Sequence, residues 1–227
     1  MIDPRVAEGD AFRDYWNRLE LRERARKVPA PVISWRRMSA TNEVESLIWE
    51  RVHGAARLLD FGSGDQALKR KFSEAGFKGR YDTFDVSREF ATTYSDVSEI
   101  GGPFDAVLCL EVIEHMPLAA GLELRERLVN WLAPGGTLVL STPNPGCIRS
   151  PFAADETHQH LYPLPDLLAW AMGRGLEVEA RRVRLLPEVV GLGLRVRLAV
   201  QQILLYFVGA DRADGSLLIA RKPSHQV

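Results

Sequence analysis

Carboxylate and imidazole side chains gather in two short stretches of this sequence. Glu111, Glu114 and His115 lie within CLEVIEHM, and His158 and His160 lie within THQHLYP. The E-x-x-E-H spacing puts the two glutamates about one helical turn apart if a helix starts there, with the histidine beside them. Carboxylates and imidazoles together can bind a divalent cation such as Mg²⁺, Mn²⁺, Fe²⁺ or Zn²⁺. A histidine that titrates near neutrality can instead remove a proton from a reacting group.

These residues allow three interpretations. If a divalent metal ion binds, its candidate ligands are Glu111, Glu114, His115 and His160. If no metal binds, His115 is the first candidate for a general base, and the other candidate catalytic residues are His158 and His160. In the third interpretation the glutamates cap helices and the histidine lies at the rim of a cleft. The sequence leaves the choice among the three open.

A second candidate for binding chemistry is a glycine-containing loop within RLLDFGSGDQALKRKF, residues 57–72. A predicted strand ends there, Gly62 and Gly64 make a tight turn, and a helix opens near Gln66. Glycines let the backbone approach a ligand closely, and the N-terminus of a helix offers it free N–H groups. With Ala67 the glycines also satisfy the dinucleotide fingerprint G-x-G-x-x-G/A, so the loop alone does not identify its ligand.

Acidic residues near the ends of predicted strands narrow the choice of ligand. Asp60 lies two residues before the first glycine. A carboxylate there repels the pyrophosphate of a dinucleotide and attracts the ammonium group of a methionine moiety. NAD is therefore not expected as the ligand. Asp85, at the end of the next predicted strand, can accept hydrogen bonds from both ribose hydroxyls. Asp96 can accept one from an adenine amino group, and Val97 can cover the ring. The alternative for Asp60 and Asp96 is that each merely stabilises its own loop.

The hydrophobic pattern places these residues in an α/β protein. Helices are predicted over 10–27, where two prolines follow, and over 42–53. Beyond them, short apolar runs alternate with helical segments, which is typical of parallel strands joined by crossover helices. The segment between the predicted strands 80–85 and 91–94 is too short to contain such a helix. The predicted strands are 57–61, 80–85, 91–94, 106–110, 137–141, 176–186 and 216–221, and the helices between them are 66–75, 118–132 and 163–174.

In order and spacing, four motifs resemble those of class I S-adenosylmethionine-dependent methyltransferases. They are D-x-G-x-G at 60–64, the acidic Asp85, FDAVLCLEVIEHM at 104–116 and LAPGGTLVLSTPN at 132–144. The resemblance implies a doubly wound α/β fold, with a seven-stranded sheet of order 3-2-1-4-5-7-6 and one antiparallel strand. It also implies S-adenosylmethionine (SAM) bound across the carboxyl ends of the strands. The implied cofactor-binding residues are Asp60, Gly62, Gly64, Gln66, Asp85, Asp96, Val97, Leu110 and Glu111.

The stretch from Glu111 to His115 and the residue Gln66 bear on which branch of that family the chain resembles and on whether it is catalytic. The stretch from Glu111 to His115 is similar to that of the small-RNA terminal 2′-O-methyltransferases and of the ubiquinone-type O-methyltransferases, which are metal-using branches. The resemblance therefore implies methylation of a hydroxyl on a small molecule, and it leaves a divalent metal ion open as a second cofactor. One alternative is an RNA 2′-O-methyltransferase. Another is a SAM-binding regulatory protein without catalysis, which Gln66 favours because the family usually has a third glycine there.

Composition and charge restrict the expected partners. The chain has 227 residues, 46% of them hydrophobic and 26% charged, as in a water-soluble protein with a full-sized core. Its formal net charge of −1 provides no basic field for nucleic acid, so a small-molecule acceptor is expected. The two cysteines make no disulfide framework and the N-terminus has no secretory signal pattern, so a cytoplasmic location is expected. The expected oligomeric state is a monomer or a homodimer.

The chain is predicted to consist of an N-terminal helical cap, residues 1–54, and a SAM-binding domain, residues 55–227. A helical insert is predicted at about 187–209 and falls in the most apolar stretch of the sequence. Charged residues near the middle of that stretch are costly in a bilayer, so no transmembrane segment is expected. The insert can serve as a lid packed on the core, as a dimer contact, or as a peripheral membrane helix that reaches a lipidic substrate.

Overall fold

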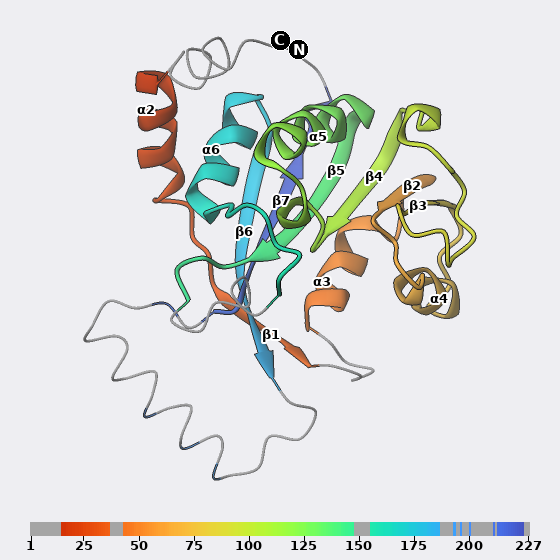
Figure 1. Ribbon diagram of the computed structural model, residues 1–227, viewed down its shortest axis with the longest axis horizontal. Helices are drawn as coiled ribbons and strands as arrows, with labels where there is room; N and C mark the ends of the chain where they lie inside the picture. Colours follow the sequence, from red (N-terminus) through yellow and green to blue (C-terminus); the bar gives the residue numbers. More distant parts are fainter. Residues whose placement is uncertain are drawn as a thin grey trace.

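The described part of the protein contains one mixed sheet of seven strands. The computed structural model describes residues 15–36, 43–147, 155–186 and 213–224, together with 193, 196, 200 and 211. The strand order is β3-β2-β4-β5-β7-β6-β1 (Figure 1). Neighbouring strands run parallel except β7, which is antiparallel to both β5 and β6. The strands are β1 (Val32–Arg36), β2 (Arg57–Phe61), β3 (Arg80–Phe84), β4 (Phe104–Leu110), β5 (Leu132–Pro143), β6 (Glu177–Leu186) and β7 (Gly215–Arg221).

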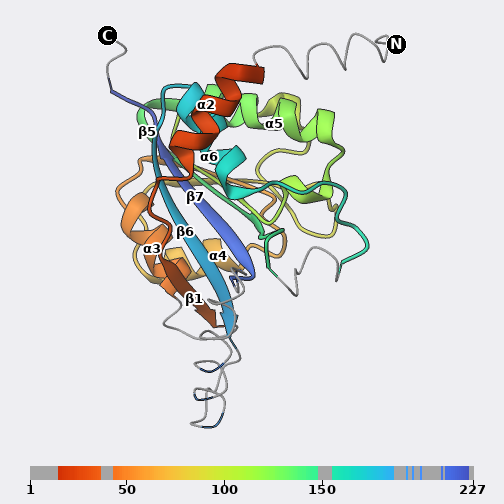
Figure 2. The ribbon, with the colours of Figure 1, turned by 90° about the vertical axis from the view of Figure 1, so that its left-hand side faces the viewer.

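Helices cover both faces of this sheet. Figure 2 shows α2, α5 and α6 on one side of the strands and α3 and α4 on the other. Two short 3-10 helices, η1 and η2, follow β3 and β4. Among the described helices, none is long and apolar enough to cross a membrane. The helices are α2 (Tyr15–Ala25), α3 (Glu43–Val52), α4 (Ala67–Glu74), η1 (Val97–Glu99), η2 (Ile113–His115), α5 (Leu118–Trp131) and α6 (Leu164–Gly173).

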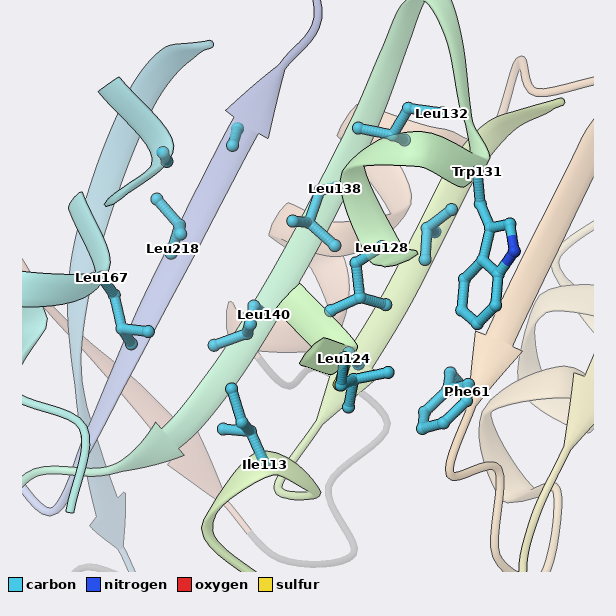
Figure 3. Close-up of a cluster of buried hydrophobic side chains, with 14 of the residues drawn as sticks. Phe61, Ile113, Leu124, Leu128, Trp131, Leu132, Leu138, Leu140, Leu167 and Leu218 are labelled. Carbon is cyan, nitrogen blue, oxygen red and sulfur yellow. The ribbon is translucent and has the colours of Figure 1, made fainter. Parts of the chain in front are cut away.

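Alternating side chains of β5 contribute to both halves of the core. Leu138 and Leu140 belong to the cluster on the α5 side, where Figure 3 shows them with Leu128 of α5. Val139 belongs to the cluster on the side of α3 and α4, together with Ile48. Fully burying one such side chain contributes about 1.5–3 kcal/mol. Because the central strands are buried on both faces, their carboxyl ends are held in fixed positions at one edge of the sheet.

The fold class predicted from the sequence is confirmed, but one edge strand differs. The predicted strand 91–94 is reduced to an isolated bridge between Tyr94 and Phe84. The hydroxyls of Thr83 and Thr93 each accept a hydrogen bond of 3.0 Å from the other residue's backbone N–H, in place of a regular ladder. The seventh strand is instead β1, which pairs in parallel with β6 at the opposite edge. Its sequence VISWR is rich in β-branched and aromatic residues, which favour strands.

The N-terminal segment, predicted as a helical cap, contributes a strand as well as helices. The predicted helix 10–27 is observed as α2 in its described part, and the predicted helix 42–53 is observed as α3. Between them, β1 joins this segment to the main sheet. The boundary at residue 54 stays a prediction. The predicted helical insert 187–209 lies outside the described residues, apart from 193, 196 and 200.

Candidate active site

The glycine loop at the end of β2 lies directly against the loop that follows β4. Gly62 and Gly64 have φ angles of +82° and +47°, in the left-handed region that favours glycine. A Cβ atom added to Gly62 would lie 2.2 Å from Cγ2 of Val112. The backbone N–H groups of Gly62 and Ser63 both donate to the carbonyl oxygen of Phe84, at 2.8 and 3.0 Å. Glycine at 62 is therefore required both by backbone conformation and by this close approach.

Gln66 adopts the backbone conformation that a glycine would favour. Its φ angle is +59°, which costs an ordinary residue about 1–2 kcal/mol. Its side-chain Nε2 donates a hydrogen bond of 2.6 Å to the carbonyl oxygen of Ala91, in the segment between β3 and η1. The side chain is thus engaged with the neighbouring loop. The departure from the three-glycine pattern leaves the left-handed turn in place.

Asp85 connects the end of β3 to the glycine loop. Its Oδ2 accepts a hydrogen bond of 2.7 Å from the backbone N–H of Gly64, and its Oδ1 accepts one of 2.8 Å from Ser87. The next residue, Val86, is 88% exposed, beside this half-buried carboxylate. The sequence analysis did not select Val86, although an apolar residue directly after a strand-end aspartate was the signal available.

Asp60 is buried at the end of β2. Its Oδ2 accepts a hydrogen bond of 2.8 Å from the hydroxyl of Tyr81. Burial raises the pKa of Asp60 to about 6 against the opposing hydrogen bond from Tyr81, and the negative charge of Asp85 raises it further. A carboxylate in such surroundings gains strongly from a cationic ligand, because that ligand offsets the cost of keeping the charge buried.

Asp96 and Val97 lie at the 3-10 helix η1. The Asp96 carboxylate accepts hydrogen bonds from the backbone N–H of Ser98 at 2.8 Å and from its hydroxyl at 2.6 Å. The Glu99 side chain accepts in return from the backbone N–H of Asp96, which completes a capping box. Val97 packs against the core cluster on the α5 side. Asp96 thus stabilises its own loop, and its role toward an adenine stays a prediction.

Two glutamates follow β4 in different surroundings. Glu111, next to Leu110 at the strand end, has a φ angle of +52° and its Oε1 accepts a hydrogen bond of 2.6 Å from the Ser141 hydroxyl. Glu114 is completely buried, and its Oε2 accepts from the Thr142 hydroxyl at 3.1 Å. Its Oε1 has no hydrogen-bond partner within the described ranges. Burial raises the pKa of Glu114, and the charge of Glu111 raises it further.

The segment with the two later histidines is attached to η2. The carbonyl oxygen of Glu114 accepts hydrogen bonds from the backbone N–H groups of Gln159 and His160, at 2.7 and 3.2 Å. The rings of His115 and His158 meet edge to face with centroids 4.6 Å apart. One potential ligand atom from each of Glu114, His115 and His158 lies within 4.8 Å of the others. The predicted convergence of the two stretches is therefore observed for these three residues.

His160 takes a different position from the one expected of a metal ligand. Its ring packs edge to face on Tyr162, with centroids 4.9 Å apart. It is not a member of the group that Glu114, His115 and His158 form. Burial lowers the pKa of His160, and the charge of Arg125 lowers it further. Of the two later histidines, either of which could have joined the cluster, His158 is the one that lies with Glu114 and His115.

The sheet order and the glycine loop at the end of β2 define the class I methyltransferase fold. The chain matches the family model described as "Methyltransferase domain" over residues 13–181, and it belongs to this family of SAM-dependent methyltransferases. The methyl donor is SAM. No curated protein sequence matches the chain.

Solved structures of three proteins share the fold. A SAM-dependent methyltransferase from Archaeoglobus fulgidus is 18% identical with a TM-score of 0.57, over 79% of this chain and 93% of that one. One from Mesorhizobium loti is 17% identical with a TM-score of 0.52, over 82% and 99%. Phosphoethanolamine N-methyltransferase 2 from Haemonchus contortus is 17% identical with a TM-score of 0.53, over 80% and 53%. At these identities the likeness concerns the fold alone.

The pH dependence of SAM binding tests the predicted role of Asp60 toward the methionine ammonium group. Since the pKa of Asp60 is raised to about 6, its carboxylate is charged above that pH and protonated below it. We expect SAM affinity to fall as the pH is lowered through 6, by up to about tenfold per pH unit. Calorimetric titrations between pH 5 and 7 measure this, with Asp60→Asn as the control that should bind weakly with a flat profile. An equally steep profile in Asp60→Asn would assign the effect to another group.

Proposed function

We propose that the protein transfers a methyl group from SAM to a hydroxyl oxygen of a small molecule. The observation that supports this most directly is that Glu114, His115 and His158 converge at the carboxyl edge of the sheet, with Glu111 nearby at the end of β4. This set, called here the acid–histidine group, consists of Glu111, Glu114, His115 and His158. It follows β4 and β5, next to the glycine loop that follows β2.

The residues at this edge suit the parts of SAM. Asp60 offers negative charge for the ammonium group of the methionine moiety. The space that a Cβ atom would occupy is open at Gly64, so a ligand can approach the backbone there. Asp85 is proposed to accept hydrogen bonds from the ribose. The exposed side chain of Val86 is available to cover the adenine ring, which removes apolar surface from water. Val97 and Leu110 are proposed to line the same part of the site.

The chemistry asked of the protein is positioning and proton removal. SAM, when bound, supplies a methyl group on a sulfonium, and in-line alignment of the acceptor accounts for much of the rate. The acceptor oxygen must lose its proton as it takes the methyl group. His115 is the proposed base, because an imidazole can accept a proton near neutral pH. Glu114, whose pKa is raised by burial and by Glu111, can hold a proton nearby.

The same residues can hold a divalent metal ion. Glu114, His115 and His158 would be its ligands, with Glu111 beside them. The buried Oε1 of Glu114, to which no described N–H group or alcohol hydroxyl donates, is a ligand atom of the required kind. A bound ion would lower the pKa of the acceptor hydroxyl. His115 cannot be base and ligand through the same nitrogen, so the two versions of the proposal exclude one another.

A small-molecule acceptor is favoured over RNA by the charge of the chain. Proteins that bind nucleic acid neutralise phosphates with lysine and arginine, whereas this chain has a formal net charge of −1. The competing proposal is methylation of an RNA 2′-hydroxyl. A protein that only binds SAM would show affinity for it without any transfer.

Transfer of labelled methyl groups tests this proposal. The full-length protein is incubated with methyl-labelled SAM and cell extract, which is then separated into RNA and small-molecule fractions. We expect label in the small-molecule fraction, and with His115→Ala we expect it to accumulate at least about 100-fold more slowly. If a metal is required, a chelator should abolish transfer and added metal should restore it, whereas chelator-resistant transfer would favour His115 as the base.

Label confined to RNA would overturn the small-molecule proposal, and SAM binding without transfer to either fraction would indicate a binding protein.

A further inference from the structure

A hydroxyl and a carboxylate that the sequence analysis did not select lie behind His115. Thr157 and Asp155 belong to the segment that ends at His160. The Thr157 Oγ1 lies 2.8 Å from Nδ1 of His115 and 2.6 Å from Oδ1 of Asp155. The backbone N–H of Thr157 also donates to Asp155 Oδ1, at 2.9 Å. The three side chains thus form a continuous row from carboxylate to hydroxyl to imidazole.

The positions of the protons in this row follow from which groups can donate. The Oδ1 of Asp155 receives hydrogen bonds from both the hydroxyl and the backbone N–H of Thr157, so the carboxylate acts as the acceptor at this end of the row. Two oxygens 2.6 Å apart need a proton between them, and only the Thr157 hydroxyl can supply it. That hydroxyl has a single proton, so toward His115 its oxygen offers a lone pair. The 2.8 Å contact then requires Nδ1 of His115 to donate.

We propose that Asp155 and Thr157 hold neutral His115 as the tautomer protonated at Nδ1, which leaves the lone pair on Nε2. Thr157 is then a positioning residue that acts through His115. This deepens the proposed function, because the Nε2 lone pair is what a general base or a metal ligand uses. The tautomer itself is a property of the protein without acceptor or metal, so it can be measured separately from activity.

The carboxylate at the far end of the row also lies close to the second imidazole of the acid–histidine group. Asp155 lies beside both imidazoles: its Oδ2 is 3.9 Å from Nε2 of His158. The Asp155 carboxylate interacts favourably with positive charge on either ring. A positive His115 could donate from Nδ1 to Thr157 as before, so proton uptake at Nε2 would leave the row intact.

The competing arrangement has the opposite tautomer. In it, the Thr157 hydroxyl would donate to Nδ1 of His115, and the imidazole proton would lie on Nε2. Asp155 would then accept a hydrogen bond from the backbone N–H of Thr157 but not from its hydroxyl. The oxygens of Thr157 and Asp155 would lie 2.6 Å apart with no proton between them, which is repulsive. A lone pair buried against Thr157 would be of no use to an acceptor hydroxyl.

Nitrogen NMR on the full-length protein distinguishes the two tautomers. Long-range ¹H–¹⁵N spectra of histidine-labelled protein show which ring nitrogen carries the proton, and His115→Gln identifies the His115 signals among the five histidines. We expect Nδ1 protonated and Nε2 unprotonated at a pH where the ring is neutral. A ring of His115 that is predominantly protonated at Nε2 would overturn the proposal, and this result needs no variant at Thr157.

Two variants at one position separate the hydroxyl from general packing. Thr157→Val keeps the shape but removes the hydroxyl, so the Nδ1-protonated form should fall from the major to a minor population. Thr157→Ser keeps the hydroxyl and should retain it. An unchanged tautomer in Thr157→Val would also overturn the proposal. Transfer assays add a separate reading: Thr157→Val should lose about 10- to 100-fold in rate. A confirmed tautomer with an unchanged rate would instead count against His115 as the acting group.

Discussion

Replacing His115 by alanine should lower the rate of methyl transfer by roughly 100- to 10,000-fold, the usual contribution of general-base catalysis. The imidazole lies within the acid–histidine group, against His158 and Thr157, on the loop that follows β4. Its loss removes the proposed proton acceptor but leaves the glycine loop and Asp85 unchanged. SAM affinity should therefore stay near that of the unmodified protein. Single-turnover rates with a labelled donor, together with calorimetric SAM binding, measure the two effects separately.

The matched control is His53→Ala, because His53 is an exposed histidine directly after α3 whose Nδ1 lies 3.1 Å from the carbonyl oxygen of Trp49 in that helix. It should leave the rate unchanged. Glu114→Ala and the double variant Glu114→Ala, His115→Ala should be about as slow as His115→Ala alone, because residues that act as one unit are not additive. A His115→Ala protein that transfers methyl groups at the original rate would rule out both the base and the ligand role.

Asp85→Ala should weaken SAM binding by about 1.5–3 kcal/mol, the range for hydrogen bonds to charged groups. At room temperature this corresponds to roughly a 10- to 150-fold higher Kd. Two losses contribute: the proposed bonds to the ribose, and the bond of 2.7 Å that holds the backbone N–H of Gly64. Calorimetry with SAM and with its demethylated product, S-adenosylhomocysteine, measures the change, and both ligands should be affected because they share the ribose.

Two further variants make the Asp85 result specific. Glu89→Ala removes the same charge from the same exposed loop and should bind SAM normally. Asp85→Asn keeps an oxygen for the Gly64 N–H but loses the charge, so its affinity should lie between those of the unmodified protein and Asp85→Ala. If Asp85→Ala folds and binds SAM with unchanged affinity, the ribose assignment is wrong.

The central part of the fold follows from local sequence patterns, whereas the edges depend on distant partners. β2 and β4 are apolar runs bounded by loops, and their observed bounds are close to those predicted. The pattern at 91–94 suggested a strand, but threonine hydroxyls there take over the backbone hydrogen bonds. β1 is only five residues long and follows two prolines, and its partner β6 lies far along the chain. Such a pairing leaves no local signal beyond β-branched residues.

The location of the candidate site was predictable, but its internal arrangement was not. The carboxyl ends of parallel strands lie at one edge of a sheet. The predicted strand ends therefore placed Asp60, Asp85 and Glu111 at the same edge, without giving the distances between them. The choice between His158 and His160 depends on side-chain direction: one ring meets His115 and the other meets Tyr162. The Asp155–Thr157 row likewise depends on a turn that brings two ordinary polar residues under an imidazole. Nothing in the spacing of those residues indicates it.

The conformation of Gln66 has a consequence for the detection of distant relatives. The turn requires a residue with positive φ at this position, and a glutamine meets the requirement while its amide bonds to the loop at Ala91. A search pattern written as three obligatory glycines would discard such chains, although their loops follow the same path. A pattern based on backbone torsion angles would retain them. Membership of the fold at this loop is therefore defined by the left-handed backbone at position 66 and not by glycine as such.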